Sequence, residues 1–255
     1  MKHQGSHNWV AQLGRVDCSV TVSQNASVMA GPSEAHAARQ IQLYKYLKFT
    51  KNMVLTWDPS NHTYRDPNGE IIQMEPNTLL YYTDGSYGAE GPLFDSRMGY
   101  VCICNGGVVA WGTSILKFRA TGVMDVEEAA ACWGCKDSVY RRELCRELGF
   151  EQLQASPVLC DNTATISFSK PSAVLSSLSK HILVRGAYTR ECQSLGIIEL
   201  IHCPGRLNAS DGTTKVLDKS LHYGMSLPTY GFINIPVPSG YQPPKDAIRK
   251  PLFKT

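Results

Sequence analysis

The sequence has no long apolar run, no strong charge of either sign and no regular cysteine pattern. No stretch approaches the roughly 18 to 20 apolar residues that a membrane-spanning helix needs, and residues 1–14 lack the apolar core of a signal peptide. We therefore expect no membrane partner. Lys and Arg total 25 against 22 Asp and Glu, so any acidic partner must meet a local basic surface, because the net charge is only +3.

The nine cysteines are an odd number and are scattered along the chain, mostly inside apolar runs. A free thiol in such a run behaves as a small hydrophobic side chain. This pattern predicts an intracellular protein, cytoplasmic or nuclear, in a reducing compartment. A chain of 255 residues can hold one large domain, or one domain of about 130 to 150 residues with an appendage.

The stretch 79–88 is an apolar, aromatic run of strand length that leads to one acid, Asp84, and then to a Gly-Ser break. A carboxylate inside a buried strand costs several kcal/mol unless a partner or a metal compensates it. Asp84 could instead cap a turn with Gly85 and Ser86, as Asp often does. This stretch alone leaves both interpretations open.

The order of apolar patterns predicts a mixed α/β fold with a central sheet. An Asn-Gly-Gly turn between two apolar runs indicates a β-hairpin, and with the preceding run it makes a three-stranded antiparallel meander. The expected elements are strands at 79–86, 98–104, 108–115, 156–160 and 197–203, helices at 126–148, 163–168 and 179–195, and a short helix from Asp211. Before them we expect partial order at 1–33, a helix at 33–48 and a strand at 53–57.

Three further acids stand at the ends of these elements. Glu127 lies in the first turn of the long helix, Asp161 ends the strand 156–160, and Asp211 opens the last short helix. If that strand pairs beside the strand containing Asp84, all four acids gather at one edge of the sheet. Such a cluster needs divalent cations, because carboxylates a few Å apart repel one another. Ligation by oxygen alone favours Mg²⁺, with Mn²⁺ as an alternative, and two ions about 3.5 to 4 Å apart suit phosphodiester hydrolysis.

The order and spacing of these acids resemble ribonuclease H, and more specifically the ribonuclease H domain at the end of a copia-type retrotransposon polyprotein. The segments that carry the resemblance are Asp84-Gly85-Ser86, Asp95 to Tyr100, Gly106-Gly107, Cys160-Asp161-Asn162, and Ser179 to Ile182 with Arg185 and Arg190-Glu191. The similarity covers roughly Ala35 to Leu217. Residues 35–51 resemble the connection helix between reverse transcriptase and ribonuclease H, and no Tyr-x-Asp-Asp polymerase motif is present. The resemblance therefore implies a terminal piece of such a polyprotein, or a gene built from one.

The resemblance also implies a fold and a division of the chain. The fold would be ribonuclease H-like α/β, a mixed five-stranded sheet flanked by helices, with a helical and strand extension before it. The divisions would be 1–76, resembling the reverse transcriptase connection, 77–217, the ribonuclease H-like domain, and 218–255, an irregular, basic tail rich in Pro and Gly.

The activity implied by the resemblance is metal-dependent endonucleolytic hydrolysis of the RNA strand in an RNA/DNA hybrid. Its catalytic residues and ligands of two Mg²⁺ ions would be Asp84, Glu127, Asp161 and Asp211. The hybrid would be one partner and a reverse transcriptase a second. The residues expected to contact nucleic acid are Asn162, Lys180, His181, Arg185 and Arg206.

The chain also departs from the family pattern. The family has Ala-Glu-Tyr where this chain has Val126-Glu127-Glu128, which leaves Glu128 as an alternative ligand, although an ungapped count back from residues 147–150 favours Glu127. Arg206 stands where related enzymes often place a histidine. These departures support a rival hypothesis, a decayed or domesticated remnant that binds nucleic acid or protein without turnover.

Overall fold

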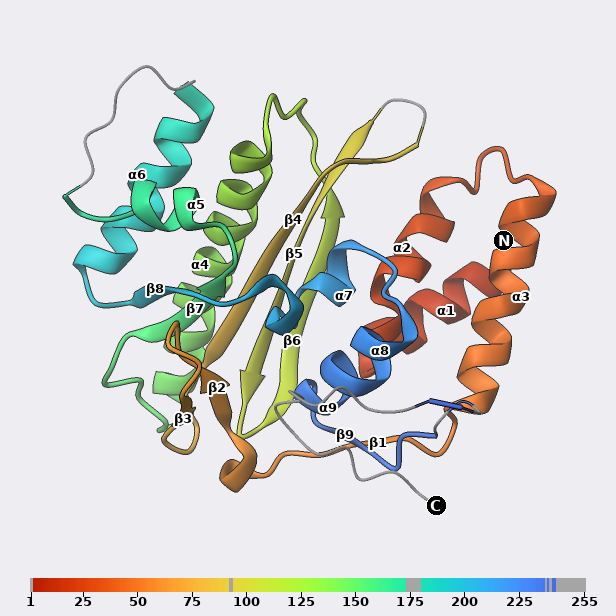
Figure 1. Ribbon diagram of the computed structural model, residues 1–255, viewed down its shortest axis with the longest axis horizontal. Helices are drawn as coiled ribbons and strands as arrows, with labels where there is room; N and C mark the ends of the chain where they lie inside the picture. Colours follow the sequence, from red (N-terminus) through yellow and green to blue (C-terminus); the bar gives the residue numbers. More distant parts are fainter. Residues whose placement is uncertain (1, 92–93, 173–179, 237, 239, 242–255) are drawn as a thin grey trace.

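The computed structural model describes residues 2–91, 94–172, 180–236, 238 and 240–241, and the structural statements concern these residues. One sheet of five strands runs through the molecule, with helices on both of its sides (Figure 1). Among the helices in the described ranges, none combines the length and the apolar character that crossing a lipid bilayer requires.

The sheet has the strand order β6-β5-β4-β7-β8. Strands β4 (Leu80–Glu90), β5 (Asp95–Cys104) and β6 (Gly107–Ile115) form the antiparallel meander that the Asn-Gly-Gly turn predicts. Strands β7 (Ser156–Cys160) and β8 (Ile198–His202) continue the sheet in parallel from the other side of β4. The predicted mixed five-stranded sheet flanked by helices is confirmed.

The helices form two layers (Figure 1). One side of the sheet carries α4 (Val123–Glu147), α5 (Thr163–Phe168) and α6 (Lys180–Ser194). The other side carries α1 (Lys2–Leu13), α2 (Ser19–Ser27), α3 (Glu34–Phe49), α7 (Asp211–Thr214), α8 (Lys219–Leu221) and α9 (Leu227–Thr229). Two small two-stranded sheets complete the fold: β1 (Val54–Leu55) with β9 (Phe232–Ile233), and β2 (Thr63–Arg65) with β3 (Ile71–Gln73).

Strand β4 belongs to the two largest hydrophobic clusters, because successive side chains of a strand point to opposite faces. Leu80 and Tyr82 are buried in the core that contains Tyr223, Leu227 and Tyr230 from the C-terminal segment. Their neighbours Leu79 and Tyr81 are buried in the core that contains Ala131 and Cys135 of α4. The same alternation sends Asp84 to the side of α7 and Gly85 to the side of α4.

The first 33 residues are more ordered than the sequence indicated, and the expectation of partial order was wrong. They form α1, a 3-10 turn at Val16–Cys18 and α2, and together these bury Ala11, Cys18 and Val22 against Leu43 of α3. Each helix is short and only weakly amphipathic. Its order therefore comes from contacts with distant residues, which local periodicity does not reveal.

The segment after residue 217 also contains regular structure. A π-helical turn at His222–Ser226 and the short helices α8 and α9 lead into β9, which pairs with β1. Residues 242–255, with the basic side chains at 245, 249, 250 and 254, lie outside the described residues. The division at residues 76 and 217 stays a prediction.

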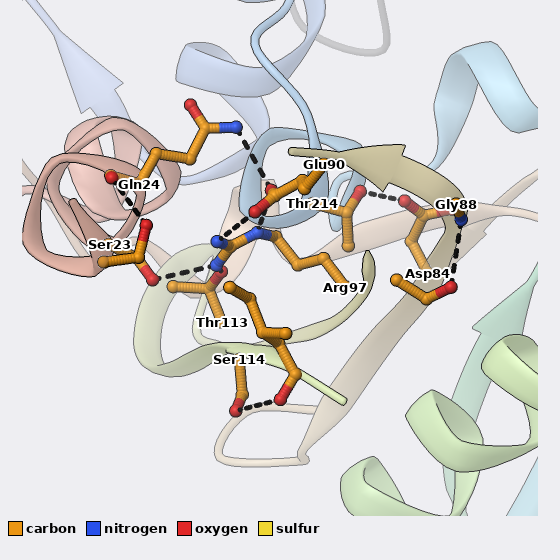
Figure 2. A network of polar contacts seen from close by, with 12 residues as sticks. Ser23, Gln24, Asp84, Gly88, Glu90, Arg97, Thr113, Ser114 and Thr214 are labelled. Carbon is orange, nitrogen blue, oxygen red and sulfur yellow. Dashed lines mark hydrogen bonds and ion pairs between the residues drawn. The ribbon is translucent and has the colours of Figure 1, made fainter. Parts of the chain in front are cut away.

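A buried arginine holds helix α2 to the sheet. Arg97 of β5 is fully buried and forms a two-point ion pair with Glu90 at the end of β4 (Figure 2). Its Nη1 donates hydrogen bonds of 2.8 Å to Ser23 of α2 and 2.8 Å to Thr113 of β6. Gln24 of α2 donates a further hydrogen bond to Glu90, at 3.1 Å. This network ties α2 to three strands on the face that also carries Asp84.

Candidate metal centre

Asp84 lies in the middle of β4, where only 2% of its surface is exposed. The next residue, Gly85, allows α4 to approach the strand closely. A Cβ atom at Gly85 would lie 2.8 Å from the backbone nitrogen of Glu127 and 2.9 Å from Cγ1 of Val126. Any larger residue at this position would push α4 away, so the Asp-Gly pair brings Glu127 to the edge at which Asp84 lies.

A second glycine allows α7 to approach from the other face. Gly99 of β5 lies directly opposite Asp84 in the antiparallel register. A Cβ atom there would lie 2.1 Å from the Thr213 hydroxyl oxygen, well inside contact distance. With no side chain at Gly99, α7 lies on the sheet, and its Thr214 hydroxyl donates a short hydrogen bond to Asp84 (Figure 2). Asp211, the first residue of α7, is carried to the same place.

The structure brings the four predicted acids together in two overlapping groups. Carboxylate oxygens of Asp84, Asp161 and Asp211 all lie within 4.8 Å of one another. Glu127 and Asp161 form a second such group with the thiol of Cys160. Asp161 belongs to both because it directly follows β7, the parallel neighbour of β4. The cluster therefore draws on β4, α4, the end of β7 and α7.

Burial and mutual repulsion favour the protonated forms of three of these acids. Burial, with the charges of Asp84 and Asp161, raises the pKa of Glu127 to about 9. Burial and Asp84 raise the pKa of Asp211 to about 7, although Lys215 opposes the shift. Burial and Asp84 also raise the pKa of Asp161. Asp84 contributes to all three shifts, so it lies at the electrostatic centre of the cluster.

Lys215 and Thr214 are site residues that sequence reasoning missed. The Nζ atom of Lys215 lies 2.9 Å from Asp211 Oδ1 and 4.0 Å from Asp84 Oδ2. Burial lowers the pKa of Lys215, but Asp84 and Asp211 outweigh this effect and raise it above its usual range. The i, i+4 spacing of Asp211 and Lys215 was visible in the sequence and was the available signal.

The donor set of this cluster fits a hard divalent cation. Its ligand atoms are carboxylate oxygens, which Mg²⁺, Mn²⁺ and Ca²⁺ prefer, and the nearby thiol of Cys160 is held protonated by burial, which raises its pKa. A bound cation would also offset the repulsion that raises the pKa values of Glu127 and Asp211. Asp84, Asp161 and Asp211 would hold one ion, and Glu127 with Asp161 would contribute to an adjacent one.

Comparison with known proteins finds a likeness of fold. No family model matches the chain, and no curated protein matches it. The ribonuclease H domain of a Mycobacterium tuberculosis protein is similar at 17% identity and a TM-score of 0.41, over 54% of this chain and 91% of that chain. The ribonuclease H1 LC11, solved with an RNA/DNA hybrid, has 15% identity and a TM-score of 0.42, over 54% of this chain and 94% of that one.

A third similar structure is the protease-reverse transcriptase of prototype foamy virus. It has 17% identity and a TM-score of 0.40, and the match covers 60% of this chain but 20% of that protein. With identities of 15–17% and TM-scores of 0.40–0.42, these likenesses carry no argument about this chain. The chemistry must therefore come from the side chains of this chain.

The neighbouring acids Glu127 and Glu128 point to different surroundings. Helix α4 begins at Val123, earlier than predicted, so both acids lie beyond its first turn. Glu128 is fully buried on the side of α5 and α6, where it accepts hydrogen bonds from Ser169 and Thr189, each 3.1 Å long. Burial raises its pKa to about 7. Glu128 belongs to neither acid group, and Glu127 alone of the two adjoins Asp161.

The residues expected to contact nucleic acid lie at different distances from the acid cluster. Asn162 adjoins Asp161 and caps α5, where its side chain accepts a hydrogen bond of 3.0 Å from the backbone of Thr165. Arg206 is exposed in the turn after β8, and a Cβ atom on its neighbour Gly205 would lie 2.9 Å from Asp161 Oδ2. These two residues therefore flank the cluster.

The three remaining candidates belong to α6. Lys180 is exposed at its first residue, and the side chain of His181 lies outside the described residues. Arg185 stacks over the ring of Phe118, with Cζ 4.1 Å from the ring centroid. Phe118 lies in the β6–α4 connection, outside the acid cluster. Arg185 therefore helps to pack α6 against that connection.

The raised pKa values predict how the pH and metal binding change the free energy of unfolding. Glu127 and Asp211 bind protons more tightly in the folded chain than in the unfolded chain, where their pKa values are near 4.5 and 3.8. Without metal, the free energy of unfolding should therefore fall as the pH rises from about 3.8, where Asp211 of the unfolded chain ionises, to about 9, the pKa of Glu127 in the folded chain. Mg²⁺ at about 100 times its Kd should restore roughly 2.7 kcal/mol.

Thermal unfolding at several pH values measures this effect. The rise in Tm caused by Mg²⁺ should be larger at pH 8 than at pH 6, because protons compete with the metal for these carboxylates. Asp84→Asn should lose most of the rise. An equal rise in that variant would place the stabilising metal elsewhere.

Proposed function

We propose that this protein is a ribonuclease H-type endonuclease that hydrolyses the RNA strand of RNA/DNA hybrids with two bound Mg²⁺ ions. The observation that carries the proposal is the convergence of Asp84, Glu127, Asp161 and Asp211 from four separate elements at one edge of a ribonuclease H-like sheet. Burying four acids together is costly unless cations bind them. Bound cations would offset this cost, so the cluster supports a metal-dependent reaction.

The bound ions would supply a water of lowered pKa and would stabilise the charge that develops on the leaving 3′ oxygen. The residues of the protein position the acids that would hold these ions. Thr214 fixes one oxygen of Asp84 by its hydrogen bond, so the carboxylate keeps a defined orientation. Gly85 and Gly99 let α4 and α7 approach within contact distance of the strands, which places Glu127 and Asp211. No covalent nucleophile is required.

Polar and charged side chains around this edge of the sheet would contact the substrate. Asn162 and the exposed Arg206 flank Asp161, and the exposed Lys180 begins α6. Cations at such positions bind phosphates, and contacts to 2′-hydroxyls distinguish an RNA strand from DNA. The proposal extends to an origin in a copia-type retrotransposon polyprotein, with a reverse transcriptase as partner, on the strength of the sequence motifs.

A second candidate is a binding module without turnover, and one observation favours it. Lys215 places an ammonium group 2.9 Å from Asp211, where it partly neutralises the cluster without a metal. In an active enzyme, this half-exposed side chain has to move aside when the ions bind. A decayed site would keep the ion pair permanently. Retention of all four acids favours the enzyme.

A cleavage assay on a labelled hybrid, with Mg²⁺ and with EDTA, tests the proposal and separates the two candidates. The matched pair Glu127→Gln and Glu128→Gln adds a positional control, because the two acids are adjacent and both buried. Glu127→Gln should reduce the cleavage rate by about 10²-fold or more, as expected for loss of a group that acts on the transition state. Glu128→Gln should lower stability by roughly 1 to 3 kcal/mol and keep most of the activity.

Failure of the unmodified protein to cut the hybrid at any Mg²⁺ or Mn²⁺ concentration, while it still binds the hybrid, would favour the binding module. Equal losses of activity in the two glutamine variants would remove Glu127 from its assigned role.

A further inference from the structure

A cavity of about 400 Å³ adjoins the acid cluster on the side of α7. It lies between the N-terminal helices and the segment that follows Asp211. Gly212 and Lys215 line it, and Lys215 is the residue whose ammonium group reaches Asp211 and Asp84. Lys215 therefore links the cavity to the candidate metal centre. The size of the cavity is within the usual range of small-molecule sites, roughly 300 to 1,000 Å³.

The walls of this cavity are mainly apolar. They are formed by Val20 and Leu43 on the side of α2 and α3, and by Val216, Leu217 and Tyr223 on the opposite side. Apolar side chains on the walls of a cavity suit the apolar faces of an aromatic ring. A nucleobase has such faces, and stacking of a base on protein side chains tolerates any base sequence.

Its inner end carries a hydrogen-bonded chain of polar side chains. Tyr46 donates a hydrogen bond of 2.7 Å to Asp17, which is also paired with Arg15 at 2.7 Å. His222 Nε2 lies 2.7 Å from the Tyr46 hydroxyl oxygen. Since that hydroxyl has a single proton and gives it to Asp17, His222 must donate from Nε2. Asp17, Tyr46 and His222 line the cavity, and their hydrogen bonds to one another and to Arg15 hold this part of its wall in a fixed arrangement.

The mouth of the cavity is positively charged. Arg39, Lys215 and Lys219 are exposed, and all three line it. The acid among the described lining residues is Asp17, which is buried and held by Arg15. The exposed charge is thus of one sign and suits a phosphate.

We propose that this cavity binds one unpaired nucleotide of the nucleic-acid strand that leaves the acid cluster. The base enters between the apolar walls, and the adjacent phosphates lie at Arg39, Lys215 and Lys219. A base that remains stacked in a duplex cannot enter, because its faces are covered by its neighbours. A blunt duplex therefore does not place its phosphates at these three cations. The nucleotide therefore belongs to a single-stranded overhang or a frayed end. The inference rests on the proposed function for the identity of the ligand.

The test measures binding in EDTA, so that no strand is cut. The full-length protein is titrated into three fluorescein-labelled probes: a 12-nucleotide single-stranded RNA, the same RNA with its bases removed at internal positions, and a blunt RNA/DNA hybrid. The variant Arg39→Glu/Lys219→Glu changes two exposed cations of the mouth. The variant Lys48→Glu/Lys51→Glu changes two exposed cations at the end of α3 that do not line the cavity, and so matches the change in charge.

We expect Arg39→Glu/Lys219→Glu to bind the intact RNA on the order of tenfold more weakly, with a shallower dependence of log K on log salt, because phosphate contacts are lost. The abasic RNA should bind the unmodified protein about tenfold more weakly than the intact RNA, a loss within the range for a stacked base. The blunt hybrid should change by about twofold or less in the mouth variant, and the control variant should match the unmodified protein.

Equal weakening in the control variant, or equal binding of abasic and intact RNA, would overturn the proposal. Melting temperatures of both variants check that the fold is kept. The outcome separates this inference from the nuclease assignment. If the protein shows the expected binding pattern but does not cleave the hybrid, only the nuclease assignment is wrong. If it cleaves the hybrid normally but does not prefer RNA with intact bases, only the nucleotide site is wrong.

Discussion

Replacing Asp84 with Asn should reduce hybrid cleavage by at least about 10³-fold, which corresponds to about 4 kcal/mol of transition-state stabilisation. Asp84 is the acid whose charge raises the pKa values of Glu127, Asp161 and Asp211 together. Loss of this one carboxylate therefore weakens every metal position in the cluster. Single-turnover cleavage of a labelled hybrid at saturating protein measures the effect.

The same substitution should leave the fold intact. Asn keeps an acceptor oxygen for the Thr214 hydroxyl, and it removes a buried negative charge from a crowded cluster. Without metal, the Tm of Asp84→Asn should equal or exceed that of the unmodified protein. Asp95→Asn is a matched control, because Asp95 begins β5 of the same sheet but pairs with Arg119 at 2.8 Å, outside the cluster. An Asp84→Asn protein with more than about a tenth of normal activity would contradict the assignment.

Arg97→Met should destabilise the protein by about 3 to 5 kcal/mol, the usual cost of leaving one partner of a buried ion pair uncompensated. The Arg97 side chain is fully buried, and that of Glu90 is only 13% exposed. Loss of the guanidinium also removes the hydrogen bonds to Ser23 and Thr113, which join α2 to the sheet. Denaturant unfolding measures the difference, and a change below about 1 kcal/mol would contradict it.

A double variant separates charge from packing. Arg97→Met/Glu90→Gln removes both charges of the pair, so it should recover part of the stability lost in Arg97→Met. Since α2 also lines the cavity beside α7, we expect the single variant to bind single-stranded RNA more weakly and the double variant to recover part of this loss.

Much of the sheet was predictable because its signals are local. The Asn-Gly-Gly turn and the apolar runs on either side of it predict the meander. A short apolar run followed by an acid predicts the end of a parallel strand. Asp161 was expected beside Asp84 for that reason, and the pairing of β4 with β7 puts it there. The start of α4 was placed three residues too late, since Gly122 at its N-terminus has no capping side chain.

What sequence reasoning missed depends on distant contacts. The ungapped count favoured Glu127 over Glu128, but it gave no sign that Glu128 is buried and bonded to Ser169 and Thr189 beside α5 and α6. Lys215 reaches the acid cluster because Gly99 lets α7 lie on the sheet. Helix α2 is held by Arg97 of β5, and α1 and α2 pack on Leu43 of α3, so their order depends on residues outside their own segments.

The most direct measurement is anomalous diffraction from crystals of this protein soaked in Mn²⁺. Two peaks should appear about 3.5 to 4 Å apart, within about 2.2 Å of oxygens of Asp84, Asp161, Asp211 and Glu127, with the Lys215 ammonium group displaced from Asp211. No peak at these carboxylates, with Lys215 still paired to Asp211 at high Mn²⁺, would contradict the account that the four acids form a metal centre.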